Sequence, residues 1–226
     1  MRRIVISISI LFLLSILSPT NLFADSKTVD QQGLVERSRI LFESFMADEN
    51  MGWFRENLSQ AKGLLIVPSL LKGGFFLGGS GGSGVLLARD RETGKWSQPV
   101  FYTIGSVTFG LQIGGEKSEV IMMIRTRRAL ESLYASSFKL GGDISVAAGP
   151  IGGGAKSNVL ADILSFVRSK GLYGGVSLEG AVLKIRDDWN SSYYGKYVRP
   201  TDIIVKKSVS NSSSEKLRNV LEKYVK

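Results

Sequence analysis

The chain of 226 residues contains no cysteine and no histidine. Without cysteine it has no disulfide, no thiol nucleophile and no thiolate metal site. Without histidine it has no imidazole metal ligand and no Ser-His-Asp triad. These two absences exclude much of the usual metal and hydrolytic chemistry. They also mean that an exported form of this chain would be stabilised by its core alone.

Acidic residues are few relative to basic ones. The chain has 20 Asp and Glu residues against 29 Lys and Arg residues, for a net charge of +9. A basic protein is suited to anionic surfaces such as lipid head groups. Simple solubility is the alternative explanation, and charge alone does not choose between the two.

Long hydrophobic runs are also scarce, and the one candidate lies at the N-terminus. Arg2 and Arg3 precede an apolar run of 14 residues, 4–17, which is shorter than the roughly 20 residues needed to span a bilayer. Ala24 provides a small residue at a plausible cleavage point. The pattern predicts a signal peptide over residues 1–24, with an uncleaved membrane anchor as the alternative. The protein is therefore expected to be exported to the periplasm or cell envelope, peripheral to a membrane, with a net charge of +7 after loss of the two arginines.

Helical periodicity marks both ends of the remaining chain. A polar, mobile segment is expected over residues 25–33, followed by apolar residues at helical spacing over 34–46. This amphipathic helix would pack on the core, or alternatively face a membrane. Residues 206–226 read as a basic linker and a second amphipathic helix, with Ser212 and Glu215 at capping-box spacing. Its apolar stripe suits core packing or a helix lying on a membrane surface.

Between these helices the pattern is that of short strands. Apolar runs alternate with glycine clusters over 63–124 and again over 143–186, with a hairpin turn expected at 91–94. A helix is expected over 126–134, with Thr126 as its N-cap. The 26 glycines exceed the roughly 16 expected at average usage. Glycine within strands marks bulges, bends or close backbone approach. The sequence thus predicts an α+β fold: a glycine-rich, strongly bent antiparallel sheet or barrel-like core with N-terminal and C-terminal helices.

Motifs that resemble catalytic signatures lack the context that their chemistry needs. Residues 79–84 match G-x-G-x-x-G, but a strand pattern continues after them where a dinucleotide site needs a helix. These glycines are interpreted as a turn joining two curved strands. The S-x-x-K matches have no S-D-N or K-T-G partner. The sequence predicts no enzymatic activity, no cofactor, no metal and no nucleic-acid partner.

A series of glycine-centred motifs runs along the chain in a fixed order. They are Ala61-Lys62-Gly63; Gly81-Gly82-Ser83-Gly84; Trp96-Ser97 with Pro99; Gly110 to Gly114; Lys139 to Gly152; Lys170-Gly171-Leu172 with Gly174-Gly175; Ser177 to Gly180; and Tyr194-Gly195. Together they resemble the SYLF family, also called the Ysc84 family, of lipid-binding domains. The resemblance places such a domain at residues 34–205.

The resemblance implies a non-catalytic protein that binds lipid or membrane, recognising anionic (phospho)lipid head groups. Eukaryotic relatives bind phosphoinositides and some bind actin, but for an exported protein only lipid association is carried over. The basic and aromatic candidates for lipid contact are Arg37, Arg39, Lys62, Lys72, Phe75, Phe76, Lys139 and Lys156. The motif residues expected to be structural are Gly81, Gly82, Gly84, Trp96, Gly110, Gly114, Gly141, Gly142, Gly149, Pro150, Gly174, Gly175 and Gly180.

This chain departs from the family pattern after Gly152. Many relatives carry an arginine where this chain has Gly153, so any ligand preference based on that arginine is not carried over. The alternative function is a protein–protein interaction or self-assembly module of the envelope, with no lipid ligand.

Overall fold

The structure is a computed structural model that describes residues 22–74, 77–109, 116–152, 160–174 and 178–225. Its helices are α1 (Leu22–Ala47), α2 (Gly52–Asn57), α3 (Arg127–Ser132), α4 (Asp187–Tyr194), α5 (Pro200–Ile204) and α6 (Glu215–Tyr224). Its strands are β1 (Gly63–Gly74), β2 (Leu77–Ala88), β3 (Val100–Phe109), β4 (Glu116–Ile124), β5 (Ser137–Lys139), β6 (Val146–Ala148), β7 (Ile163–Ser169), β8 (Leu172–Gly174) and β9 (Val182–Ile185). The predicted α+β class is confirmed.

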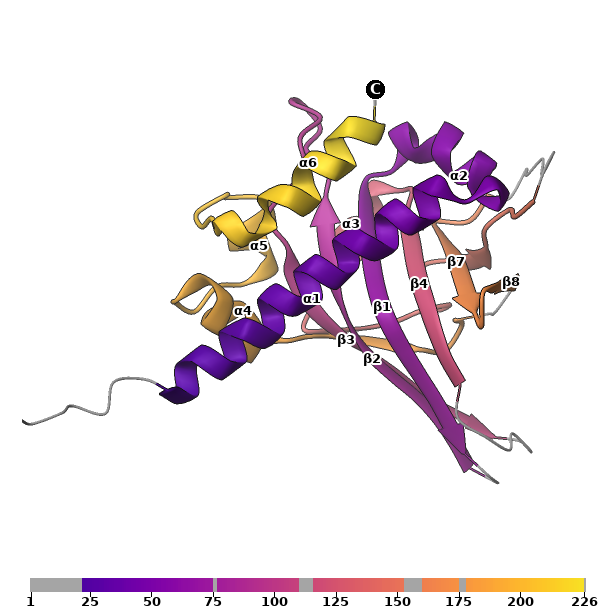
Figure 1. Ribbon diagram of the computed structural model, residues 1–226, viewed down its shortest axis with the longest axis horizontal. Helices are drawn as coiled ribbons and strands as arrows, with labels where there is room; N and C mark the ends of the chain where they lie inside the picture. The colour runs from indigo at the N-terminus through magenta and orange to yellow at the C-terminus, as the bar shows by residue number, and fades with distance from the viewer. Residues whose placement is uncertain (1–21, 75–76, 110–115, 153–159, 175–177, 226) are drawn as a thin grey trace, which may run out of the picture.

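The described strands form one strongly curled sheet that resembles half of a barrel (Figure 1). Its strand order is β5-β9-β3-β2-β1-β4-β7-β6, with β8 paired to β7. All neighbours are antiparallel except β6 and β7. The strands β1 to β4 are the longest, and the helices and shorter strands pack at one end of them (Figure 1).

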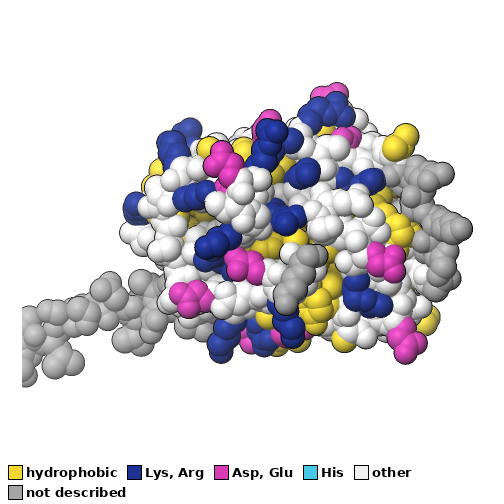
Figure 2. Space-filling view, turned by 90° about the horizontal axis from the view of Figure 1, so that it is seen from above, with side chains coloured by type: hydrophobic (Ala, Val, Ile, Leu, Met, Phe, Trp, Pro, Cys, Tyr) yellow, Lys and Arg dark blue, Asp and Glu magenta, His cyan; other side chains and the backbone are white. Residues whose placement is uncertain are grey.

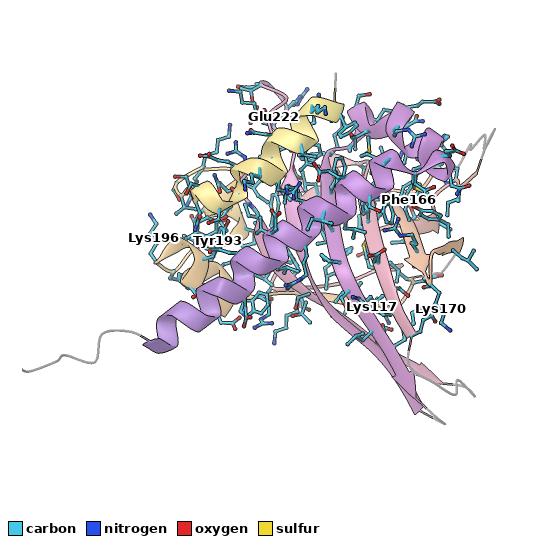
Figure 3. The ribbon with its side chains drawn as sticks, in the orientation of Figure 1. Lys117, Phe166, Lys170, Tyr193, Lys196 and Glu222 are labelled. Atoms are coloured by element: carbon cyan, nitrogen blue, oxygen red, sulfur yellow. The ribbon has the colours of Figure 1, made fainter. Side chains whose placement is uncertain are left out.

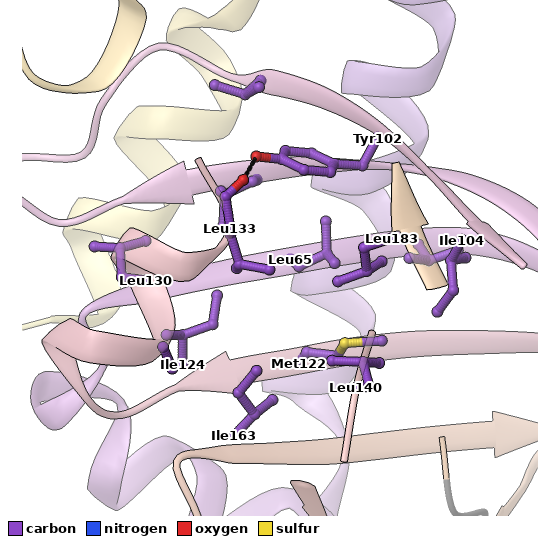
Figure 4. Packing of buried hydrophobic residues seen from close by; sticks show 14 of the residues in the cluster. Leu65, Tyr102, Ile104, Met122, Ile124, Leu130, Leu133, Leu140, Ile163 and Leu183 are labelled. Atoms are coloured by element: carbon purple, nitrogen blue, oxygen red, sulfur yellow. Dashed lines mark hydrogen bonds between the residues drawn. The ribbon is translucent and has the colours of Figure 1, made fainter. Parts of the chain in front are cut away.

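The central strands are buried on both faces. In β1, Leu64 and Ile66 pack in one apolar cluster with α1, α2 and α6, whereas Leu65 and Val67 point into the other cluster, inside the curl. This alternation follows from the two-residue period of a strand. Figure 4 shows the inner cluster, which the end of α3 closes through a hydrogen bond from the Tyr102 hydroxyl to the Leu133 carbonyl.

A bulge at Pro68 bends β1 against the glycines of β2. The pairing register shifts between Ile66 and Ser69, at the one residue that has no N–H to donate to the ladder. Opposite the bulge, a Cβ on Gly82 would lie 2.4 Å from the Ser69 carbonyl oxygen, and one on Gly84 would lie 2.7 Å from that of Ile66. The prediction of a turn over 79–84 is therefore wrong. These glycines lie inside β2, where the neighbouring backbone approaches too closely for a side chain.

The outer face of the sheet is covered by α1, which crosses it diagonally, with α6 beside it (Figure 1). Leu217 and Leu221 of α6 are fully buried in the cluster that includes Phe42 and Phe45 of α1. Residues 206–225 therefore belong to the same folded unit as residues 34–205, and the sequence boundary at 205 is not a structural one. Their helix packs beside α1 in this apolar cluster.

Two details of the terminal helices differ from prediction. Residues 25–33, expected to be a mobile polar segment, lie within α1, which begins at Leu22. Part of this segment lies in the core, because its polar residue Gln31 is fully buried. At the other end, Ser212 begins a 3-10 turn, and the residue that caps it is Asn211, whose side chain accepts from the Ser213 N–H. The expected capping box is absent because this turn moves the start of α6 to Glu215.

Candidate functional site: a basic cleft

The residues predicted to contact lipid are not gathered at one place. Lys62 precedes the first residue of β1 and Lys72 lies near its last, so roughly 30 Å of extended strand separates them. Lys139 lies in β5, at the edge of the sheet. Basic residues at opposite ends of a long strand face different parts of the surface. These three lysines therefore do not form one site.

The cations of α1 differ in their availability. Arg39 forms ion pairs with Glu36, at 2.6 Å, and with Glu43, and its pKa is raised by the hydrogen bond to Glu36. Arg37 is exposed on the same helix. The charge of Arg39 is therefore balanced locally, and Arg37 remains a prediction for lipid contact.

Several predicted residues lie outside the described part of the chain. They are Phe75, Phe76, Gly110, Gly114, Gly153, Lys156 and Gly175. Among the remaining motif residues, Trp96 is buried, Gly81 has open space around it, Pro150 is half-buried and Gly174 ends β8. Gly141 and Gly180 have φ angles of +83° and +82°, a region that favours glycine.

The motif glycines Gly142 and Gly149 have different surroundings. A Cβ on Gly149 would lie 2.3 Å from the ring of Phe166, whereas a Cβ on Gly142 would meet nothing closer than the Lys139 carbonyl oxygen at 3.8 Å. Of these two glycines, only Gly149 is required by close packing.

Basic residues do converge where β1 begins and β2 ends, around the turn at 90–95. Asp90 shapes this turn by accepting hydrogen bonds from the backbone N–H groups of Glu92 and Thr93, at 3.1 and 2.7 Å. Arg89 donates to the Gly94 carbonyl at 3.1 Å and also to the Ser59 carbonyl. These bonds hold the turn in a defined position against the segment that precedes β1.

The second wall of this region is the N-terminus of α3, which is anchored by Asp162. Thr126 caps the helix and donates to Asp162 at 2.7 Å, and the Ser145 N–H and hydroxyl donate to the same carboxylate at 3.0 and 2.8 Å. Burial acts to raise the pKa of Asp162, but these hydrogen bonds outweigh it and lower the pKa to about 2. An ionised Asp162 thus fixes the position of the helix start that carries Arg127 and Arg128.

Two adjoining cavities lie between these walls, and we call them together the basic cleft. Their volumes are about 400 and 650 Å³, and they share Arg89, Asp90, Arg91 and Arg127. The basic residues that line the cleft are Lys62, Arg89, Arg91, Lys95, Arg127, Lys207 and Arg218, and the acidic ones are Asp90 and Glu92. Figure 2 looks down on this end of the molecule and shows Lys and Arg side chains over much of the face.

Five of the seven basic residues of the cleft fall into two groups. Arg89 and Arg218 donate to backbone carbonyls, and Lys207 forms a 2.7 Å ion pair with Asp90. Lys62 and Arg91 are exposed, and no carboxylate of the described residues pairs with either. The first group builds the cleft, and the second offers positive charge to a ligand.

Sequence reasoning identified only Lys62 among the cations of this cleft. The turn at 91–94 and the cap at Thr126 were both predicted, but nothing in the sequence placed them side by side. The arrangement arises because Lys62 donates its N–H to the Ile124 carbonyl and accepts from the Arg89 N–H. The pairing of β1 with both β2 and β4 thus brings the two basic segments together.

No group of acidic residues in the described chain could hold a metal ion. Within the same residues, no helix is both long enough and apolar enough to cross a membrane.

A family model described as "Las17-binding protein actin regulator" (Ysc84) matches residues 105–224. This chain belongs to the Ysc84 family. The matched range includes α6, in agreement with the burial of that helix in the core.

Named relatives extend the match toward the N-terminus. SH3 domain-containing YSC84-like protein 1 of Homo sapiens is 34% identical over 172 residues, which are 74% of this chain and 50% of the relative. An SH3 domain-containing protein of Schizosaccharomyces pombe is 40% identical over 144 residues, 61% of this chain and 33% of that protein. LAS seventeen-binding protein 3 of Saccharomyces cerevisiae is 35% identical over 145 residues, 61% of this chain and 31% of the relative. The chain spans half or less of these relatives.

Proposed function

We propose that this protein is a non-catalytic, membrane-associated protein of the cell envelope that recognises anionic (phospho)lipid head groups with the basic cleft. The observation that carries the proposal is the excess of positive charge in the cleft, where Lys62 and Arg91 have no carboxylate partner among the described residues. Membership of the Ysc84 family supports a binding function rather than a catalytic one.

The electrostatics of the cleft favour an anionic ligand. Its two carboxylates are Asp90, which is neutralised by Lys207, and the exposed Glu92. A basic residue near an anionic membrane surface contributes about 1 kcal/mol, and the attraction falls off over a Debye length. The cleft residues Lys62, Arg91 and Arg127 would act together at that range.

Co-sedimentation with vesicles tests this proposal. The purified protein should bind vesicles that contain phosphatidylglycerol more tightly than vesicles of phosphatidylcholine alone, and salt should weaken the binding. Arg91→Ala and Arg127→Ala should each lower the affinity about fivefold, as expected from about 1 kcal/mol per residue. Arg37→Ala removes a basic residue of α1 that lies outside the cleft, and if the cleft is the contact surface it should change the affinity less.

Equal binding to neutral vesicles, with no effect of salt, would overturn the proposal. A loss of affinity in Arg37→Ala but not in Arg91→Ala would instead place the membrane contact on α1.

A second candidate is a protein–protein interaction or self-assembly module. It is favoured by the name of the yeast relative, which describes binding to another protein. Failure to bind any vesicle, together with a concentration-dependent increase in molecular mass in light scattering, would support self-assembly over lipid binding.

A further inference from the structure

The larger cavity of the basic cleft is amphipathic. One wall is the segment 89–98, which contains the turn at 90–95, together with the start of α3. The opposite wall is the segment 203–210, which follows β9 and α4. Its volume of about 650 Å³ lies within the range of sites that hold small molecules. The cavity is therefore large enough for part of a lipid molecule, not only for a phosphate group.

Apolar side chains gather on one side of this cavity. Ile203 and Ile204 form a buried floor, Tyr134 and Val209 are partly buried against the same inner cluster, and Val205 is 61% exposed. The smaller cavity lacks this lining and is bordered mainly by Lys62, Arg89, Arg91 and Arg127. Polarity thus changes along the cleft, from charged in the smaller cavity to mixed in the larger one.

An ion pair holds the two walls of the larger cavity together. Lys207 from one wall lies 2.7 Å from Asp90 on the other. The hydrogen bond from Lys207 and those from Thr93 lower the pKa of Asp90 far below its ordinary value. Asp90 therefore stays ionised, and its charge is balanced by Lys207.

Arg127 stands where the charged and apolar parts of the cleft meet. It lines both cavities, and its guanidinium interacts with the Tyr134 hydroxyl. Burial raises the pKa of Tyr134, and Arg127 partly offsets this. A ligand with an anionic group on Arg91 and Arg127 would direct an attached aliphatic chain along Tyr134 toward Val205 and Val209.

From this arrangement we propose that the basic cleft binds a single anionic amphiphile. Arg91 and Arg127 would bind its phosphate, and the groove along Tyr134, Val205 and Val209 would bind its aliphatic chain. This inference deepens the proposed function and rests on it, because it names the ligand class of the same cleft. It goes further in one respect: the protein would recognise one lipid molecule with a defined stoichiometry, and not only the charge of a surface.

Isothermal titration with three soluble probes tests the inference. Lysophosphatidic acid, used below its critical micelle concentration, carries both the phosphate and the chain. Glycerol phosphate carries the phosphate alone, and lysophosphatidylcholine carries the chain with a zwitterionic head group. We expect one lysophosphatidic acid per protein, bound at least tenfold more tightly than either of the other probes. Burial of only two methylene groups is enough for such a ratio over glycerol phosphate. The ratio over lysophosphatidylcholine comes from the net negative charge of the phosphate facing Arg91 and Arg127.

Variants separate the groove from the charged part of the cleft. Val205→Glu places a like charge in the groove on an exposed residue, and it should weaken lysophosphatidic acid binding at least fivefold. Val182→Glu makes the same change at a residue of β9 that is 41% exposed, and it should have no effect. Glycerol phosphate should bind Val205→Glu within about threefold of the unmodified protein, because its phosphate contacts Arg91 and Arg127 and not the groove.

The outcomes distinguish this inference from the function on which it rests. If glycerol phosphate binds as tightly as lysophosphatidic acid, or if Val205→Glu changes nothing, the groove does not hold the chain. If no soluble amphiphile binds while anionic vesicles still sediment the protein, the single-molecule site is wrong and the surface association remains. If neither soluble lipid nor vesicles bind, both proposals are wrong.

Discussion

The helix-covered face of the sheet and the basic cleft both carry arginines, but these arginines have different roles. On the helix-covered face, Arg168 lies 2.7 Å from Glu119 and 2.9 Å from the Ser44 hydroxyl, and its guanidinium lies 4.8 Å from the ring centre of Phe45. It ties β7 to α1. In the cleft, Arg91 is exposed with no acidic partner among the described residues.

The packing of the two regions differs in the same way. Phe166, labelled in Figure 3, lies under the first helices, with Phe54 and Trp53 rings at centroid distances of 4.9 and 6.3 Å. Aromatic rings fill that layer, whereas the cleft retains two open cavities. A basic side chain therefore indicates a binding surface only where no neighbouring carboxylate or aromatic ring already engages its charge.

The largest effect should come from removing α6 from the helix-covered face. Leu221→Ala should lower the free energy of unfolding by about 2–5 kcal/mol, the cost of a cavity in a packed core. Truncation after Val205 removes the whole helix and should prevent folding. Val205→Ala, an exposed control, should stay within about 0.5 kcal/mol. Thermal and urea melts measure all three, and a folded truncated protein would show that α6 is accessory.

A smaller but clear effect should come from the motif glycines. Gly149→Val should destabilise the protein by about 1–3 kcal/mol, because the added side chain overlaps the Phe166 ring in the helix-covered layer. Gly142→Val is the matched control in the same motif and should change stability less, since its Cβ would meet nothing closer than the Lys139 carbonyl oxygen at 3.8 Å. Equal melting temperatures for the two variants would contradict this account of the packing.

Asp162 should support the cleft rather than the helix layer. Asp162→Asn should cost about 1.5 kcal/mol, as it weakens charge-assisted hydrogen bonds to Thr126 and Ser145. The folded-state pKa of Asp162, about 2, is below its ordinary 3.8, so its contribution is present above pH 4 and is lost as the pH falls toward 2.

Acid titration of stability measures this contribution. The difference in free energy of unfolding between Asp162→Asn and the unmodified protein should shrink between about pH 4 and pH 2. A difference that is the same throughout this interval would show that the carboxylate charge plays no part.

The smallest effect should be that of Arg39→Ala on α1. Its exposed ion pairs with Glu36 and Glu43 should contribute under about 0.5 kcal/mol each to stability. Vesicle affinity should stay within about twofold, in contrast to the fivefold loss expected for Arg91→Ala. A larger loss of affinity for Arg39→Ala than for Arg91→Ala would reverse the comparison between the two regions.

The candidate site was only partly predictable. The turn at 91–94 follows from local preferences for glycine, and the cap at Thr126 follows from the need to satisfy the first N–H groups of a helix. Both signals lie within a few residues of sequence and were read correctly. The meeting of Arg91 with Arg127 was not readable, because it depends on strand pairings between residues far apart in the chain.

The α+β class, the strand-forming apolar runs and the amphipathic end helices followed from the sequence alone, because periodicity and local backbone preference act over short stretches. The family was indicated separately, by the resemblance of an ordered series of glycine-centred motifs. Tertiary structure decided three other features: that Gly82 and Gly84 lie within a strand, that α6 is core, and that Lys62 and Arg91 of the cleft are available while Arg39 is not. The physical reason is the same in each case. Close backbone approach, burial and ion pairing are properties of neighbours in space, and those neighbours are set by the curl of the sheet.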